Sequence, residues 1–177
     1  MTDIEGLIAE VYASAGNRLG AYGFVLTGTR HDAEELVQAA LVKTLIRRRR
    51  LDDARAVEGY VRATMRTLHI DRIRRERTFA RLAPTASAVA RADDPADVVV
   101  QGGDIASALA SLPPRVRTAV ALRFYDDLTV AQVASAMGLK EGTVKKYLEE
   151  GRIKLAPILG LNEGDAERVE VVDKVQR

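Results

Sequence analysis

The chain has 177 residues, 47% of them hydrophobic and 29% charged, so it can bury the core of one large domain or of two small ones. It contains no cysteine, which excludes a disulfide framework and a thiolate zinc site. The first residues are acidic where a secretory signal is basic, and no apolar run approaches the roughly 18 residues of a membrane span. These features predict a cytoplasmic protein without membrane insertion.

The net charge is only +2, but it is unevenly distributed along the chain. Residues 1–42 carry a net charge of −4, residues 43–77 hold twelve Lys or Arg against five Asp or Glu, and residues 161–177 carry −2. A basic stretch between acidic ones favours a polyanion as the partner of the middle segment. Taken alone, the same charge run also fits a solvated helix face rich in ion pairs.

The first half of the chain predicts amphipathic helices. One begins at Asp32, placed as an N-cap with Glu35 three residues later, and its buried stripe is Ala33, Leu36, Val37, Ala40, Leu41, Thr44 and Leu45. The next extends from Val57 to about Arg77 and buries Val57, Val61, Met65 and Leu68. Another face of this helix carries Arg62, Arg66 and His69, before the cluster Arg72, Arg74, Arg75 and Arg77.

Residues 78–103 change in composition and predict a flexible linker, because they are rich in Ala and Ser and contain Pro84, Pro95, Gly102 and Gly103. Helical patterns resume at Asp104 and last to about Ile158. We therefore expect an all-α protein of two small helical domains, residues 1–77 and 104–160. An acidic tail, residues 161–177, follows. It fits either a disordered terminus or a segment that docks back on the second domain.

Residues Thr129 to Leu155 predict a helix-turn-helix. Thr129 caps a short helix, Gly138 permits the tight turn, and a second helix begins near Glu141 with Val144 and Leu148 facing inward. In this motif the N-terminal part of the second helix enters the major groove of DNA. The residues expected to approach bases and phosphates are Lys140, Thr143, Lys145, Lys146 and Tyr147.

The segment SLPPRVRTAVALRFYDDLT, residues 111–129, together with this motif resembles region four of bacterial sigma factors, and the extracytoplasmic-function (ECF) group is the nearest match. The segment DAEELVQAALVKTL, residues 32–45, resembles the region-two helix that binds the polymerase clamp. The segment YVRATMRTLHIDRIRRER, residues 60–77, resembles the promoter-melting segment. Two matches in the family's order are far more specific than a helix-turn-helix alone.

The resemblance implies a transcription initiation factor that is not an enzyme and needs no cofactor or metal. Its partners would be the clamp and flap regions of core RNA polymerase, promoter DNA and, as a further candidate, an anti-sigma protein. By analogy Asp32, Glu35 and Gln38 would face the clamp, and residues 140–147 would read the minus-thirty-five element. The minus-ten element would be held by Arg62, Arg66, Thr67, Arg72, Arg74 and Arg75.

This chain departs from the family at several positions. Leu45 or Ile46 and Tyr60 stand where relatives often carry Trp, and Thr67 stands where a frequent Asn falls. Lys146-Tyr147 replaces the usual Ser-Arg of the recognition helix. The promoter sequence therefore does not follow from the resemblance.

Two other functions share some of these features. A helix-turn-helix regulator of the response-regulator type has a similar recognition helix, but it would carry alternating strands in front, and residues 1–103 show no strand periodicity. An enzyme would have to use His31, His69 and scattered carboxylates. These residues form no metal-ligand spacing, phosphate loop or nucleophile constellation.

Overall fold

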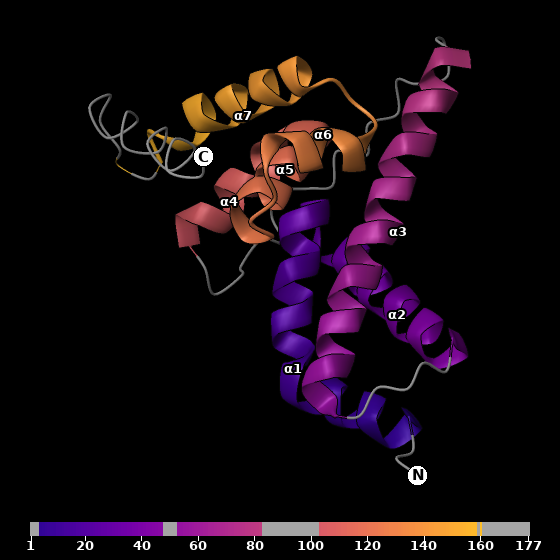
Figure 1. Ribbon diagram of the computed structural model, residues 1–177. Helices are drawn as coiled ribbons and strands as arrows, with labels where there is room; N and C mark the ends of the chain where they lie inside the picture. The colour runs from indigo at the N-terminus through magenta and orange to yellow at the C-terminus, as the bar shows by residue number, and fades with distance from the viewer. Residues whose placement is uncertain (1–3, 48–52, 83–102, 159, 161–177) are drawn as a thin grey trace, which may run out of the picture.

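The computed structural model describes residues 4–47, 53–82, 103–158 and 160, and within these ranges all regular structure is helical (Figure 1). The all-α prediction is confirmed. Most of the predicted linker, the acidic tail and the end of the basic run at residues 48–50 lie outside the described residues.

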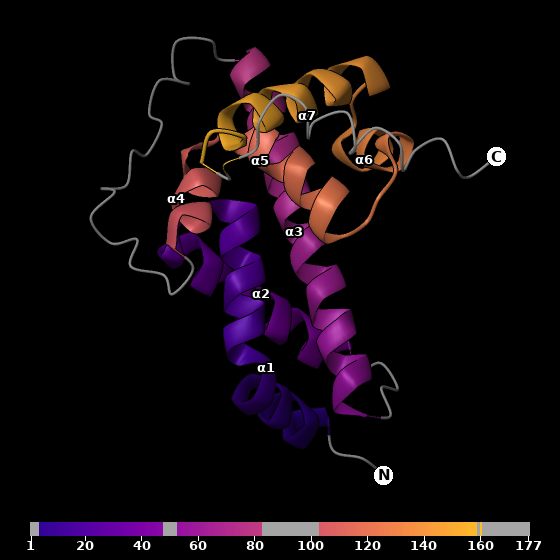
Figure 2. The ribbon, with the colours of Figure 1, turned by 90° about the vertical axis from the view of Figure 1, so that its left-hand side faces the viewer.

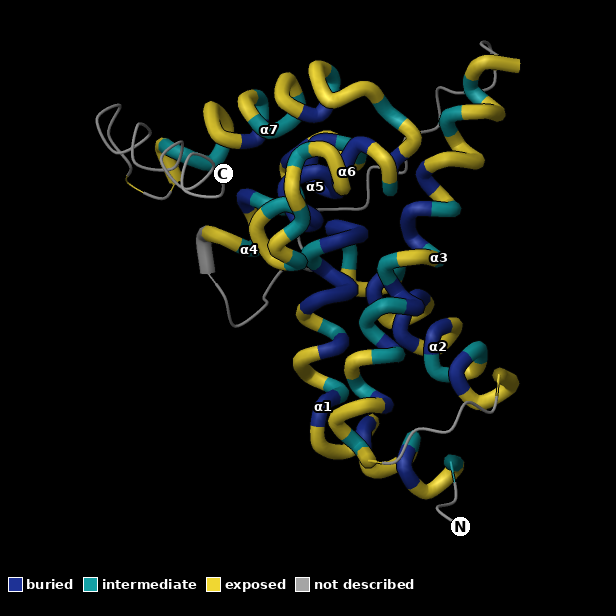
Figure 3. Tube along the Cα trace, viewed as in Figure 1, coloured by how far each residue is buried: buried dark blue, intermediate teal, exposed yellow. Residues whose placement is uncertain are grey.

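The N-terminal group consists of α1 (Ile4–Thr27), α2 (Arg30–Arg47) and α3 (Ala54–Leu82), which pack against one another in all three pairings. Figure 3 shows their buried faces turned inward. The expected stripes supply much of this core, with Leu19 and Tyr22 of α1 fully buried beside Val57, Val61 and Met65 of α3. The prediction that Leu45 is buried was wrong, because the end of α2 extends beyond the neighbouring helices and leaves this side chain 36% exposed. Helix α3 passes through the predicted boundary at Arg77 and ends at Leu82.

The turn between α1 and α2 begins at Gly28, whose φ of +82° favours glycine. The next residue, Thr29, caps α2. Its hydroxyl accepts a hydrogen bond from the backbone N–H of Asp32 at 3.1 Å and donates one to the Asp32 carboxylate at 2.9 Å. The prediction of Asp32 as N-cap was therefore wrong by one turn, because α2 starts directly after Gly28 and places Asp32 inside the helix.

The C-terminal group contains α4 (Gly103–Ser111), α5 (Pro114–Val120), the π-helical turn η2 (Ala121–Tyr125), α6 (Val130–Met137) and α7 (Glu141–Leu155). The capping box at the start of α6 pairs Thr129 with Gln132, and Gly138 ends α6 with a φ of +64°. Val144 of α7 is fully buried. The predicted helix-turn-helix is thus formed by α6 and α7.

The two groups pack against each other. Ile70 of α3 belongs to the core of the helix-turn-helix, and Ala121 of η2 belongs to the core of the first three helices. In Figures 1 and 2 the upper part of α3 lies beside α6, in agreement with their contacts. His69 of α3 also meets Thr118 of α5, with 2.9 Å between Nε2 and Oγ1. Because the Thr118 hydroxyl donates to the Pro114 carbonyl, His69 acts as the donor through Nε2–H.

We expect Gly151→Ala to lower the free energy of unfolding. A Cβ at Gly151 would lie 2.6 Å from Cγ2 of Val120, because α7 crosses α5 closely there. Overpacking of this kind costs about 1–3 kcal/mol. The control is Gly59→Ala on the exposed side of α3, where no atom lies within 4 Å of an added Cβ, and it should stabilise by about 0.5–1 kcal/mol. Equal stabilisation by both variants in thermal denaturation would contradict the close crossing.

His69 should make the fold sensitive to mild acid. Burial, with repulsion from Arg117 and Arg72, lowers the pKa of His69 to about 4. When the folded-state pKa of a histidine is depressed, the free energy of unfolding is highest at pH values above its unfolded-state pKa, about 6.5. It decreases as the pH falls from 6.5 toward 4, because protons bind the unfolded chain more readily than the folded one. Urea denaturation should show a loss of roughly 2 kcal/mol between pH 7 and pH 5.

The loss should persist in His31→Gln, because His31 is exposed, and shrink in His69→Gln. An unchanged acid dependence in His69→Gln would mean that another group is responsible.

Candidate nucleic-acid interface

The arginines of α3 do not share one face. A helix with 3.6 residues per turn spreads positions 62 to 77 around its circumference, and their contacts confirm this. Arg62, Arg66, Arg74 and Arg77 contact the C-terminal group, whereas Arg72 contacts α2. Thr67 is exposed, and its hydroxyl donates to the Ala63 carbonyl at 2.9 Å. The six residues expected to hold the minus-ten element therefore fall on separate surfaces.

Arg62 and Arg66 lie beside an aromatic and acidic cluster at the junction of the two groups. The Tyr22 hydroxyl donates to Asp126 Oδ2 at 2.8 Å, and the guanidinium nitrogens of Arg62 and Arg66 lie 3.9 and 3.8 Å from the same carboxylate. The ring of Tyr125 stacks on Tyr22 with centroids 5.1 Å apart. Burial and the neighbouring Asp126 carboxylate raise the pKa of Tyr22, so its hydroxyl stays protonated and can donate.

The C-terminal part of α3 contacts the turn of the helix-turn-helix. Arg74 donates to the Ser135 carbonyl at 2.9 Å, and Arg77 donates to the Gly138 carbonyl at 2.7 Å. These carbonyls belong to the end of α6, where helix carbonyls lack intrahelical donors and attract cations. Two arginines of the basic cluster thus cap α6, the helix that precedes α7.

Arg72 and Asp32, expected to bind DNA and polymerase respectively, form an ion pair of 3.0 Å. Burial acts to raise the pKa of Asp32, but hydrogen bonds from Arg72 and Thr29 outweigh it and hold that pKa below its ordinary value. The pair lies in a groove between α2 and α3 that Glu35 and Arg75 also line. Gln38, one turn beyond Glu35, is exposed on α2.

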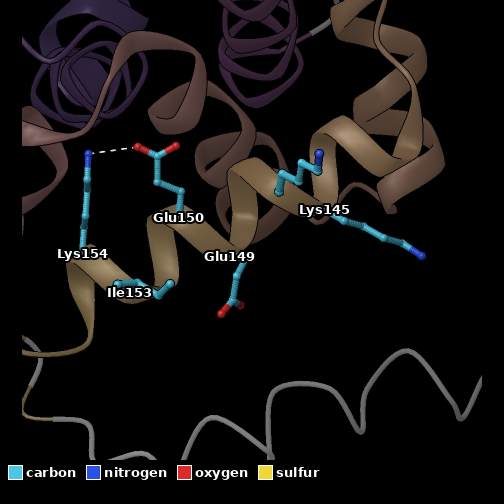
Figure 4. A pocket seen from close by; sticks show the side chains of 6 residues that line it. Lys145, Glu149, Glu150, Ile153 and Lys154 are labelled. Carbon is cyan, nitrogen blue, oxygen red and sulfur yellow. Dashed lines mark hydrogen bonds and ion pairs between the residues drawn. The ribbon is translucent and has the colours of Figure 1, made fainter.

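The outer face of α7 carries the residues expected to read DNA. Lys140 precedes the helix and is exposed, Thr143 is half-buried, and Lys145 and Lys146 are exposed. In the part of the chain that the structure describes, neither Lys145 nor Lys146 is in an ion pair. Farther along, Lys154 pairs with Glu150 at 3.0 Å (Figure 4), and Arg152 pairs with Glu149 at 2.6 Å. Free cations are therefore concentrated in the first turns of α7.

Tyr147, also expected at the DNA interface, is half-buried. Its ring packs on the apolar clusters that join α5, α6 and α7, because position 147 falls three residues after the buried Val144. Its contribution to the structure is the packing of α7.

Several residues of this region are not assigned to a site by the sequence. Tyr22 and Asp126 lie 104 residues apart, so no spacing could pair them. Arg77 belongs to the basic cluster but was not assigned to a site. Arg117, which is 6% exposed, donates to the carbonyls of Leu26, Thr27, Ala110 and Leu112. A buried position for this arginine has no signal in the local sequence.

Within the described ranges, no group of three or more His, Asp or Glu side chains could hold a metal ion. None of the described helices is long and apolar enough to cross a membrane. The arginines of α3 and the lysines of α7 are cationic, and Tyr125 is aromatic, so these surfaces suit a polyanion such as a nucleic acid.

Two family models match the chain. Sigma-70 region 2 matches residues 11–79, and Sigma-70, region 4 matches residues 103–155. The first covers nearly all of α1 to α3, and the second covers α4 to α7. The matches therefore correspond to the two helical groups.

Relatives and a solved structure agree with the family models. The ECF RNA polymerase sigma factor SigE of Mycolicibacterium smegmatis is 28% identical over 85% of this chain and 60% of its own length. The RNA polymerase sigma-E factor of Streptomyces avermitilis is 30% identical over 78% of this chain and 77% of the relative. The ECF RNA polymerase sigma factor SigF of Caulobacter vibrioides is 32% identical over 83% of this chain and 82% of the relative.

The fold is similar to that of the sigma factor RpoE of Bartonella quintana, solved in complex with the anti-sigma factor NepR, with a TM-score of 0.53 and 20% identity over 92% of this chain and 100% of that one. With regions 2 and 4 both present and in order, and with relatives of 30% and 32% identity aligned over most of their length, the chain belongs to the ECF family of RNA polymerase sigma factors.

Proposed function

We propose that this chain binds core RNA polymerase and directs promoter-specific initiation, with α3 holding the minus-ten element, α7 reading the minus-thirty-five element, and the basic end of α3 assisting strand opening. The observation that carries the proposal is the separation of three chemically distinct surfaces on three helices. These are the acidic and amide face of α2, Arg62 and Arg66 on α3, and Lys145 and Lys146 on α7.

The polymerase contact is assigned to Asp32, Glu35 and Gln38. Glu35 and Gln38 are exposed one turn apart on α2, and Asp32 lies one turn before Glu35 with its carboxylate held by Arg72. A line of acidic and amide side chains on one rigid helix suits a basic protein surface. The ion pair with Arg72 fixes the first member of that line.

The minus-ten contact is assigned to α3. Strand opening requires a surface that favours single strands, which means cations for phosphates and aromatic faces for bases. Arg62 lies over the ring of Tyr22, at 4.9 Å from its centroid, and so combines the two kinds of contact.

The minus-thirty-five contact is assigned to the start of α7. Lys140, Thr143, Lys145 and Lys146 lie where a recognition helix enters the major groove. The two promoter elements are roughly 25 base pairs apart, or roughly 85 Å at about 3.4 Å per base pair. Because α3 packs against α6, simultaneous contact with both elements requires the two groups to separate, and the roughly 20 residues between α3 and α4 could span up to about 70 Å of that distance.

The proposal is tested by transcription with purified core polymerase on a library of genomic fragments. Core enzyme with the chain should start at discrete positions preceded by two shared sequence elements at constant spacing, and core enzyme alone should not. A regulator that does not form holoenzyme would instead bind duplex DNA tightly by itself and yield no new starts. Two small DNA modules on a linker have low avidity until a third body holds their spacing.

We expect Lys145→Ala with Lys146→Ala to weaken recognition of the upstream element while affinity for core polymerase is retained. A base-edge contact contributes about 1–3 kcal/mol, so transcription from promoters that depend on this element should fall about tenfold or more. Lys154→Ala is the control, since its side chain is paired with Glu150 on the same helix. Unchanged output from the double variant would rule out this placement of the recognition surface.

A further inference from the structure

The contact between the two groups is a built interface. The guanidinium of Arg117, on α5, donates to the Leu26 carbonyl at 3.4 Å and to the Thr27 carbonyl, both at the end of α1. It also donates at 3.0 and 3.1 Å to the carbonyls of Ala110 and Leu112 beside α4. Any Cβ at Gly28 would lie 2.2 Å from this guanidinium. The backbone of α1 is thus shaped to receive a side chain from the C-terminal group.

Between one and two turns before the end of α1, Tyr22 lies beside Arg62 and Arg66 of α3, and the three side chains surround the Asp126 carboxylate. We call the surface that these three side chains present to the C-terminal group the Tyr22 pocket. A phenol hydroxyl and two guanidinium groups converge there, and these donors bind phosphate oxygens as readily as carboxylates. The flat face of Tyr22 adds the kind of surface on which a nucleic-acid base stacks.

Asp126 of the C-terminal group is enclosed by the Tyr22 pocket, and Tyr125, which is 44% exposed, covers the Tyr22 ring. The Asp126 carboxylate, 7% exposed, takes the hydrogen bond of Tyr22 and lies between the two arginines. The Tyr125 ring lies against Tyr22 with 25° between their planes, as a stacked base would. One adjacent pair of side chains thus presents an anion and an aromatic ring to the positions suited to a phosphate and a base.

The turn η2 produces this placement. Its π-helical geometry brings the Asp126 N–H to the Ala121 carbonyl at 3.2 Å, while Ala121 itself is buried among α1, α2 and α3. Asp127 follows with a φ of +53° and turns the chain away, so its carboxylate is exposed. Of the two neighbouring acids, only Asp126 enters the pocket.

We propose that the Tyr22 pocket binds one nucleotide of single-stranded DNA and that Tyr125 and Asp126 occupy it as an intramolecular substitute for that nucleotide. We call the packing of the N-terminal group against the C-terminal group the closed arrangement. It is incompatible with nucleotide binding at the Tyr22 pocket, so the two groups must separate before the pocket can bind a nucleotide. The inference rests on the proposed function, because it assigns the pocket to the strand-binding surface of α3.

The test is binding of a fluorescent single-stranded oligothymidylate to the full chain without polymerase, followed by anisotropy over a range of salt. Asp126→Asn keeps the shape of the side chain and removes its charge, so affinity should rise about tenfold through loss of the closed population. Asp127→Asn makes the same change of net charge next to the pocket and tolerates the positive φ, so its affinity should stay within about twofold of the parent chain.

A second readout reports the closed arrangement itself. Because the chain has no cysteine, dyes can be attached at Ala13→Cys on α1 and Ala131→Cys on α6, both exposed positions. Energy transfer should fall in Asp126→Asn, and in the parent chain when oligothymidylate is added, but not in Asp127→Asn. Tyr125→Ala should change affinity and transfer in the same direction, which gives a second variant should Asp126→Asn fold poorly.

Equal affinity of Asp126→Asn and the parent chain, or an equal gain in Asp127→Asn, would overturn the inference. So would a gain that survives addition of Arg62→Ala to Asp126→Asn, because the pocket would then not be the binding site. Transcription by the parent chain with core polymerase separates the two proposals. Normal initiation with no effect at Asp126 contradicts only the inference, and tighter binding without initiation contradicts only the proposed function.

Discussion

A single buried cation holds the arrangement of this protein together. Arg117 is removed from water and forms no ion pair within the described part of the chain, and burial lowers its pKa to about 10, so it remains charged at neutral pH. An unpaired buried charge costs several kcal/mol unless hydrogen bonds replace its hydration. Four backbone carbonyls from the ends of two helices do so here. Those carbonyls converge only if α1 ends where it does and the two groups meet.

Helix α3 is the element that both groups share. The N-terminal half of α3 packs on α1 and α2, whereas Ile70 enters the core of the helix-turn-helix. Because side chains leave a helix in every direction, its arginines are distributed among different neighbours. Arg72 stabilises the α2 face, and Arg74 and Arg77 cap α6. A cluster that is continuous in sequence thus serves three separate contacts.

The same cations have two classes of partner. Arg62 and Arg66 meet a carboxylate from within the chain, and the spacing and chemistry of that contact match what a nucleic-acid strand would offer. Asp126 is 7% exposed and also accepts the Tyr22 hydrogen bond, so its contacts hold the two groups together more firmly than ion pairs open to water, which typically contribute below about 1 kcal/mol each. The apolar contacts at Ile70 and Ala121 and the Arg117 hydrogen bonds act beside them.

The sequence by itself determined the features that depend on local periodicity and caps. The stripes of α2 and α3, the Thr129–Gln132 capping box and the turn at Gly138 follow from residues within a few positions of one another, where helix geometry dictates the contacts. Exposure of Lys145 and Lys146 followed in the same way. Tyr147 packs on the cluster that contains Val144. Its position three residues after Val144 predicts this packing, whereas the resemblance to a recognition helix predicts a DNA contact.

Only the tertiary structure decided which distant residues are partners. Thr29 rather than Asp32 caps α2, and this frees Asp32 to bind Arg72, 40 residues away. The meeting of Tyr22 with Asp126 and the burial of Arg117 depend on how the two groups pack. Charge and hydropathy patterns indicate which side chains are able to pair, but each side chain has many compatible partners in the sequence. The actual partner is decided when whole helices pack, because burial and close approach favour one arrangement.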